Sequence, residues 1–139
     1  MIYGIGTDIV QISRIEHIIK KNKAGFVKRV LTQHEIDLFE NRGASAHFLA
    51  KRFAAKEAFA KAFGTGIGAK VSFLDLMIKN DDKGKPFFIP SEKLRLQLIE
   101  LGIKKAHLTL SDEKENAIAF VVIEMEEGKE KRASGLGSF

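Results

Sequence analysis

The sequence contains no cysteine and no tryptophan, and it has one tyrosine and two prolines among its 139 residues. Without cysteine, the chain has no disulfide, no thiolate metal site and no cysteine nucleophile. It also lacks an apolar run of the roughly 20 residues that a transmembrane helix needs, and its first residues show no signal-peptide pattern. We therefore expect a cytoplasmic protein with no membrane partner.

Phenylalanine and basic side chains, by contrast, are abundant. The chain has 11 phenylalanines, a formal net charge of +5 and a pI of about 9.5. An apolar fraction of 45% is normal for a globular protein, and this length corresponds to one domain. The positive charge indicates an anionic partner: a nucleic acid, a phosphorylated small molecule or an acidic protein. Charge alone does not choose among the three.

The hydrophobic pattern predicts the order β-α-α-α-β-β-α-β-β. We expect strands over residues 1–10, 71–79, 86–89, 106–110 and 117–125. The expected helices are a long one over about 46–63 and shorter ones that begin at the capping boxes Ser13–Glu16 and Thr32–Glu35 and at Ser91, with Gly25 as a break after the first. This order indicates an α+β domain over residues 1–125, with a mainly antiparallel sheet packed on one long helix and several shorter helices. Residues 126–139 are charged and then glycine-rich, which predicts a flexible tail.

A stripe of alanines marks the long helix. Ala50, Ala54, Ala58 and Ala62 recur every four residues, so another element can approach that face closely. The stripe and the many phenylalanines predict surface that one small domain does not bury alone.

The same helix carries a cluster of charges. Glu57 lies four residues before Lys61, with Arg52 and Lys56 nearby and a glycine turn, Gly64–Gly66, directly after the helix. A carboxylate among cations beside such a turn suits a metal ion and a polyphosphate. The alternative is an ordinary helical ion pair, worth about 0.2–0.5 kcal/mol, with Gly64 as the helix stop.

Asp8 interrupts the apolar first strand, where an unpartnered carboxylate is costly to bury. It either caps the strand end locally or serves with Glu57 as a metal ligand; magnesium takes one or two carboxylates together with waters and substrate phosphates. His107, near Thr109 and Ser111, can bind phosphate or simply pack. Spacing indicates neither a Ser-His-Asp triad nor a zinc site.

Together these segments resemble the holo-acyl-carrier-protein synthase family, the small 4′-phosphopantetheinyl transferases, over about residues 1–125. The resemblance rests on four blocks in the family's order: Gly4-Ile5-Gly6-Thr7-Asp8-Ile9-Val10; Arg52-Phe53-Ala54-Ala55-Lys56-Glu57-Ala58 with Lys61-Ala62 and Gly64-Thr65-Gly66; Gly84-Lys85-Pro86; and His107-Leu108-Thr109-Leu110-Ser111-Asp112. Many members have His after the last Ser of that strand, where this chain has Asp112, so no catalytic histidine is assigned there.

The resemblance implies a 4′-phosphopantetheinyl transferase fold and the transfer of phosphopantetheine from coenzyme A to a serine of acyl carrier protein, with release of adenosine 3′,5′-bisphosphate, in support of fatty acid biosynthesis. It implies Mg²⁺ on Asp8 and Glu57, with Lys61 as the third catalytic residue. The residues expected around coenzyme A are Arg52, Lys61, Gly64, Thr65, Gly66, Lys85, Pro86, His107, Thr109 and Ser111. For the general base, a metal-bound water, Glu35 and Asp37 all stay open.

The implied carrier protein is acidic, and the basic first helix can steer it into place. The candidate contacts are Arg14, Lys20, Lys21, Lys28 and Arg29; the alternative is a solvated face. Family members form cyclic trimers with coenzyme A between subunits, so the resemblance implies a homotrimer. A nucleic-acid-binding module is the rival from another class, but the sequence has no aromatic-interleaved basic strand and no helix-turn-helix pattern, so we expect no nucleic acid. A transferase that serves a polyketide or peptide-synthase carrier is the nearer rival.

Overall fold

The computed structural model describes residues 1–128. Its elements are β1 (Ile2–Gln11), α1 (Ile12–Val30), α2 (Gln33–Asn41), α3 (Ala46–Phe63), the 3₁₀ turn η1 (Phe73–Asp75), β2 (Leu76–Asn80), β3 (Pro86–Pro90), α4 (Glu92–Glu100), β4 (Ile103–Asp112) and β5 (Asn116–Met125). Within those residues no helix is long and apolar enough to cross a membrane. Most of the expected tail, residues 129–139, lies outside the described part of the chain.

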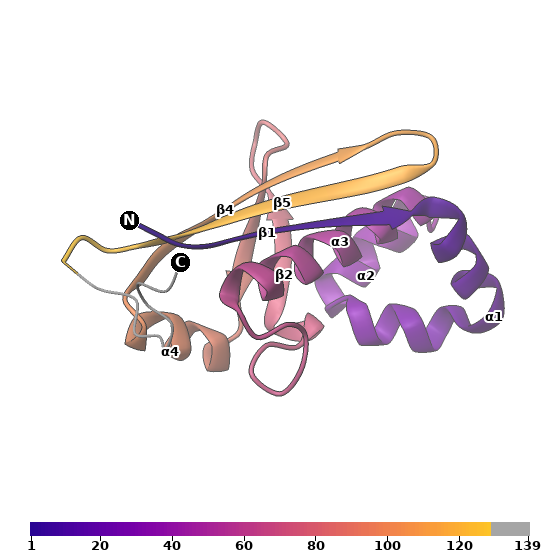
Figure 1. Ribbon diagram of the computed structural model, residues 1–139. Coiled ribbons are helices and arrows are strands. Elements are labelled where there is room, and N and C mark those ends of the chain that lie inside the picture. The colour runs from indigo at the N-terminus through magenta and orange to yellow at the C-terminus, as the bar shows by residue number, and fades with distance from the viewer. Residues whose placement is uncertain (129–139) are drawn as a thin grey trace.

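Three long strands form an antiparallel sheet in the order β1-β5-β4, and β2 and β3 form a separate antiparallel hairpin. Figure 1 shows the three strands running together over α3, with α1 and α2 at one end and α4 at the other. The predicted α+β class with a mainly antiparallel sheet on one long helix is confirmed.

The alanine stripe of α3 is covered by β1 of the same chain. A Cβ on Gly6 would overlap the carbonyl oxygen of Ala58, and a Cβ on Gly4 would overlap that of Ala62, so only glycine lets the strand lie this close. All four alanines of the stripe are buried. The expectation that the stripe needs a second chain to cover it is therefore wrong.

The first helix differs from its prediction at both its expected start, Ser13, and its expected break, Gly25. It begins directly after Gln11, with no side-chain cap, so the capping box at Ser13 is wrong. The backbone N–H of Ile12 instead donates to the Glu115 carbonyl at 2.8 Å, which carries the chain from β1 straight into the helix. The helix is kinked at Asn22, and Gly25 continues it, with its N–H donating to the Asn22 side chain.

Two other helix starts are confirmed: Thr32 and Glu35 form the predicted capping box, and the Ser91 hydroxyl accepts from the N–H of Leu94. The predicted strand over 71–79 is wrong in its first half. There the Asp75 carboxylate accepts from the N–H and hydroxyl of Ser72, which closes the η1 turn and delays β2 to Leu76.

A buried ion pair fixes α2, α3 and β2 to one another. Glu35 and Lys56 have fully buried side chains and lie 2.7 Å apart. The Lys56 ammonium also donates to the Val30 carbonyl, and Glu35 accepts from the backbone N–H groups of Thr32 and Ile78. Burial lowers the pKa of Lys56, and the Glu35 carboxylate opposes that shift. This buried pair thus fixes α3 relative to α2 and the β2–β3 hairpin.

Candidate functional site

Asp8, Glu57 and Lys61 meet at the β1 edge of the sheet. Asp8 alternates with Gly4 and Gly6 on the face of β1 that meets α3, so its carboxylate points toward the helix. The Lys61 ammonium lies 2.9 Å from Asp8 Oδ1 and 3.1 Å from the Thr7 carbonyl oxygen. The Lys61 side chain is 51% exposed and that of Asp8 15%, so a ligand can reach the pair from solvent.

Glu57 lies in the same electrostatic environment. Burial raises the pKa of Glu57, the negative charge of Asp8 raises it further, and Lys61 and Arg29 oppose the rise. Glu57 also lines an open groove of about 580 Å³ between α1, α3 and the segment that leads to η1. The groove is lined by Arg29, Phe53, Glu57, Ile67, Ser72, Phe73 and Leu74.

The glycine turn after α3 lies next to Lys61 in the chain. Gly64 ends the helix with a left-handed φ of 97°, and Gly66 has a φ of 68°, so both positions favour glycine. The Thr65 hydroxyl donates to the Gly66 carbonyl. The turn therefore leaves exposed backbone close to the Asp8–Glu57–Lys61 cluster.

Arg52 and Pro86 line a different cavity, which we call the basic pocket, at the β4 edge. It has a volume of about 180 Å³ and is lined by Arg42, Phe48, Lys51, Arg52, Asn80, Gly84, Pro86, Leu110 and Asp112. The guanidinium groups of Arg42 and Arg52 lie 5.6 Å and 4.7 Å from the centre of the Phe48 ring. Burial lowers the pKa of Arg52, and Glu35 and Arg42 act on it in opposite directions.

One nitrogen of the Arg52 guanidinium is hydrogen-bonded and another is not. Its Nη2 donates to Asn80 Oδ1 at 3.2 Å, and the Asn80 amide donates to the Gly84 carbonyl, which ties the Gly84-Lys85-Pro86 turn to the guanidinium. Its Nε is buried and has no hydrogen-bond partner among the described residues. Lys85 itself is exposed on the turn.

His107, Thr109 and Ser111 lie on neither of these sites. They alternate along the exposed face of β4, opposite to α3, beside Ile118 and Phe120 of β5. His107 Nε2 lies 2.8 Å from Glu124 Oε1, and this hydrogen bond lowers the pKa of Glu124. Within one chain, these three residues do not join the Asp8–Glu57–Lys61 cluster.

The five basic residues expected to meet a carrier protein are all exposed on α1. Arg29 differs from the other four, because it also lines the groove beside Glu57 and lies over the Phe26 and Phe73 rings. It therefore connects the basic helix face to the carboxylate cluster.

Sequence reasoning misplaced two charged residues and overlooked others. Lys56 was grouped with Arg52 and Lys61 as cations around Glu57 suited to a polyphosphate, but it is fully buried in an ion pair with Glu35. Glu35 was a candidate general base, but it is fully buried and both of its oxygens accept hydrogen bonds; Asp37 is exposed on α2 and bonds Gln33. Arg42 and Lys51 of the basic pocket were missed, since no motif connects a helix end, a helix face and a distant hairpin.

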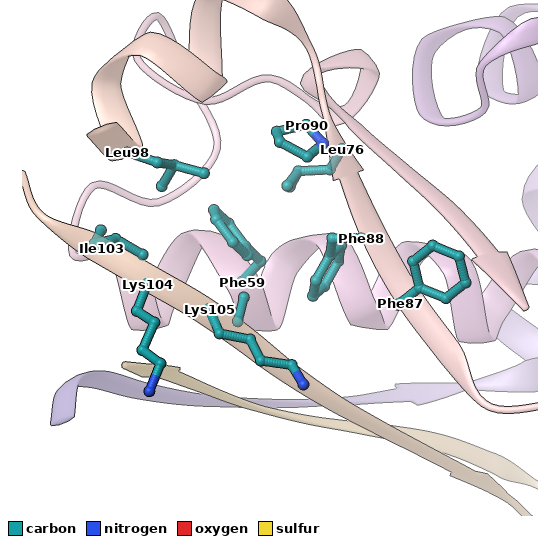
Figure 2. A pocket seen from close by; sticks show the side chains of 10 residues that line it. Phe59, Leu76, Phe87, Phe88, Pro90, Leu98, Ile103, Lys104 and Lys105 are labelled. Carbon is teal, nitrogen blue, oxygen red and sulfur yellow. The ribbon is translucent and has the colours of Figure 1, made fainter. Parts of the chain in front are cut away.

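An apolar cavity of about 300 Å³ lies between the β2–β3 hairpin, α4 and the start of β4. Figure 2 shows Phe59, Leu98 and Phe88 around it, with the ammonium groups of Lys104 and Lys105 directed away. It carries no carboxylate or histidine among its lining residues, so it lacks the chemistry of the other two sites.

Comparison with known proteins identifies the family of this chain. Residues 4–121 match the model of the 4′-phosphopantetheinyl transferase superfamily. The chain is 62% identical over 127 residues to a holo-[acyl-carrier-protein] synthase of Ruthia magnifica subsp. Calyptogena magnifica, covering 91% of this chain and all of that protein.

Two crystal structures of holo-[acyl-carrier-protein] synthases also match. One, from Neisseria meningitidis, has a TM-score of 0.86 and 50% identity over 89% of this chain and 99% of that one. The other, from Bacillus anthracis in complex with coenzyme A (3′,5′-ADP), has a TM-score of 0.76 and 43% identity over 91% of this chain and 99% of that one. The chain therefore belongs to the 4′-phosphopantetheinyl transferase superfamily, among the holo-[acyl-carrier-protein] synthases.

Proposed function

We propose that the Asp8–Glu57–Lys61 cluster is the centre at which this chain transfers the 4′-phosphopantetheine group of coenzyme A to a serine of apo acyl carrier protein. The observation that carries this assignment is that Asp8 pairs with Lys61 and that both act electrostatically on Glu57, which lines an open groove. The residues come from β1 and α3, so the folded chain, rather than one local motif, builds the centre.

The reaction moves one phosphoryl group between two oxygens. The carrier serine oxygen bonds to the phosphorus that bears pantetheine, the bond from that phosphorus to the bridging oxygen breaks, and 3′,5′-ADP departs with the electron pair. The serine proton goes to a base. Lys61, with its exposed ammonium, is placed to donate to phosphate oxygens as charge moves toward the leaving group. Arg29 adds positive charge at the same groove.

The donor set of the centre fits Mg²⁺. Asp8 and Glu57 supply carboxylate oxygens, which this hard cation prefers. Burial and, after it, the negative charge of Asp8 raise the pKa of Glu57, and a bound cation would oppose that rise. Within residues 1–128 no group of three or more His, Cys, Asp or Glu side chains could hold a metal. Waters and substrate phosphates must then complete the coordination. When bound, the ion would neutralise phosphate charge. In the absence of the ion, Lys61 donates to Asp8 and holds its carboxylate in place.

The basic pocket is the proposed site for the 3′-phosphate of coenzyme A. It presents Arg42, Lys51 and Arg52; the buried Arg52 Nε makes no hydrogen bond among the described residues and faces Glu35 Oε2 at 3.6 Å. Three cations attract the charge of a phosphate, and a guanidinium matches phosphate geometry. Since the cavity also holds Gly84 and Pro86, the turn expected to contact the nucleotide is part of its wall.

The two sites open at opposite edges of the sheet, which supports a homotrimer. Asp8 is on the edge strand β1 and the basic pocket borders the edge strand β4. Glu57 follows Arg52 by five residues, which turns a helix by about 140°, so the two side chains leave α3 on different sides. If the β4 edge of one copy meets the β1 edge of the next, each coenzyme A lies between two chains, and this head-to-tail contact closes into a ring.

The outer face of the sheet offers a second surface that a neighbouring copy can cover. Ile5, Ile9, Ile118 and Phe120 are all exposed there, with relative exposures of 61%, 63%, 42% and 42%. A contiguous apolar face on a small domain marks an interaction surface. His107, Thr109 and Ser111 share this face, so a neighbouring copy brings them toward the coenzyme A of the adjacent site.

The basic face of α1 is the proposed docking surface for the acidic carrier, and a fatty-acid carrier in the cytoplasm is the substrate we favour. Its contact residues are Arg14, Lys20, Lys21, Lys28 and Arg29. Because Arg29 extends this face to the groove, a carrier on α1 has its serine near the carboxylate cluster. A polyketide or peptide-synthase carrier remains the alternative substrate, and comparing turnover on the two carriers distinguishes them.

The direct test is to incubate the purified chain with Mg²⁺, coenzyme A and apo carrier protein, and to weigh the carrier by mass spectrometry. We expect the mass of one phosphopantetheine to be added, and we expect Glu57→Gln to abolish this addition while its thermal melt is kept. Near-normal turnover of Glu57→Gln would leave Glu57 as a helical ion-pair partner of Lys61 and remove the assignment.

Assembly has its own test. Light scattering during gel filtration should give three times the chain mass of 15.5 kDa. Mixing and reassembling two inactive variants, Asp8→Asn and His107→Ala, should restore part of the activity, because some shared sites then receive both native residues. A fully active monomer at micromolar concentration would refute the trimer and leave the chemistry standing.

A further inference from the structure

Asp112 places a negative charge on the rim of the basic pocket, whose other charged lining residues are cations. Its Oδ2 lies 2.9 Å from His47 Nδ1 and its Oδ1 lies 3.4 Å from Lys51 Nζ. The hydrogen bond from His47 and the charge of Lys51 lower the pKa of Asp112 despite some burial, so the carboxylate is ionised at neutral pH. The Asp112 side chain is 29% exposed and lines the pocket, so solvent and a ligand in the pocket can reach it.

Lys51 thus has two possible partners, Asp112 and a phosphate bound in the pocket. In the free chain its ammonium pairs with Asp112, while Arg42 makes no ion pair with a carboxylate among the described residues and Arg52 faces the buried Glu35 at 3.6 Å. A phosphate group that enters the pocket must take Lys51 from Asp112 and must also lie near the Asp112 charge. Both effects weaken phosphate binding, and neither acts on a ligand that lacks this phosphate.

We propose that Asp112 is a specificity-determining residue that limits how tightly the basic pocket holds the 3′-phosphate. This inference rests on the proposed function, in which coenzyme A and the product 3′,5′-ADP carry the same 3′-phosphate. The pocket binds substrate and product through that group alike, so tight binding there would hold the product as firmly as the substrate. Asp112 keeps this shared interaction weak and speeds the departure of 3′,5′-ADP.

The contacts of Asp112 separate this role from simple packing. It lies at the end of β4 and contacts the first two turns of α3, so removing it loses the contact with His47 and the ion pair with Lys51, both partly exposed, a small effect on stability. Removing its charge from the pocket rim strengthens the attraction of three cations for a phosphate by about three- to tenfold in affinity. A purely structural role would change the affinities of two nucleotides that differ only in the 3′-phosphate by the same factor.

The experiment measures, by titration calorimetry on the full chain, the affinities of 3′,5′-ADP and of 5′-AMP, which lacks the 3′-phosphate. We expect Asp112→Asn to bind 3′,5′-ADP about three- to tenfold more tightly with the affinity for 5′-AMP unchanged, and Asp112→Glu to restore the native value. Glu92→Gln is the matched control, because it removes a carboxylate paired with Arg95 on the distant α4 and should change neither affinity.

Unchanged or weaker binding of 3′,5′-ADP by Asp112→Asn, or an equal gain for 5′-AMP, would overturn the inference. If that variant does not melt cooperatively, Lys51→Gln makes the comparison in the other direction and should weaken only 3′,5′-ADP; an equal loss for both nucleotides would again overturn it. Transfer to the carrier by the native chain is assayed separately. The proposed function therefore stands or falls on that assay, whatever the nucleotide affinities show.

Discussion

Two lysines five residues apart on α3 should respond to the same substitution in opposite ways. Lys56 is fully buried and holds Glu35, whereas Lys61 is half exposed and holds Asp8. Lys56→Met leaves the Glu35 carboxylate buried without its main partner, which costs about 3–5 kcal/mol. For a chain of this length that loss lowers the melting temperature by about 10–20 °C. Lys61→Met breaks an exposed pair worth at most about 1 kcal/mol.

Activity should show the reverse order, with the larger loss in Lys61→Met. That variant lacks the donor to phosphate and should have a kcat at least a hundredfold lower. Lys56→Met, assayed well below its melting temperature, should keep the KM for coenzyme A within about threefold. Thermal melts followed by circular dichroism and the carrier mass assay give both quantities on the same samples. If Lys56→Met melts like the native chain, or if Lys61→Met is the less stable variant, the division into a structural and a catalytic lysine is wrong.

Further predictions concern the strand contact, the helix face and an acid-sensitive turn. Gly6→Ala forces β1 away from α3, so we expect a loss of about 2–3 kcal/mol of stability in urea melts and a larger loss of kcat than stability alone explains. Reversing Arg14 and Lys21 to Glu should raise the KM for carrier at least tenfold and that for coenzyme A little, and added salt should raise the native carrier KM in the same way. Burial opposes ionisation of Asp75, but hydrogen bonds from Ser91, Ser72 and Lys93 outweigh it and lower its pKa below 3.8. The stability it contributes is therefore present above pH 4 and lost as the pH falls through the lowered pKa; urea melts from pH 7 to pH 3 should show this acid loss, and Asp75→Asn should reduce it.

Local sequence signals predicted those elements whose ends are decided locally. Thr32, Ser91 and Gly64 each supply the bond or the backbone conformation that starts or stops a helix, and each was identified correctly. The start of α1 and the first half of the predicted strand over 71–79 were wrong because distant or competing groups decided them. The Glu115 carbonyl takes the N–H of Ile12, and Asp75 draws Ser72 into a turn.

The site was predictable where residue chemistry is conspicuous. An aspartate in an apolar strand and a carboxylate among lysines stand out, and the fold brings them together. Helical spacing could not tell Lys56 from Lys61, because their difference depends on Glu35, which lies on another helix. The basic pocket was only partly predictable, since Arg42, Lys51 and Asp112 become neighbours through α3 and β4.

The two faces of β1 connect the proposed catalytic centre to the proposed assembly. On the inner face, Gly4 and Gly6 bring the strand against α3, which lets the short Asp8 side chain reach Lys61. On the outer face, Ile5 and Ile9 stay exposed. Among the described residues β5 is the one strand that pairs with β1, so β1 is an edge strand of this sheet. A neighbouring copy that covers this strand would therefore supply the distant basic pocket and also hold Asp8 in register, and separating the subunits should cost activity by both routes.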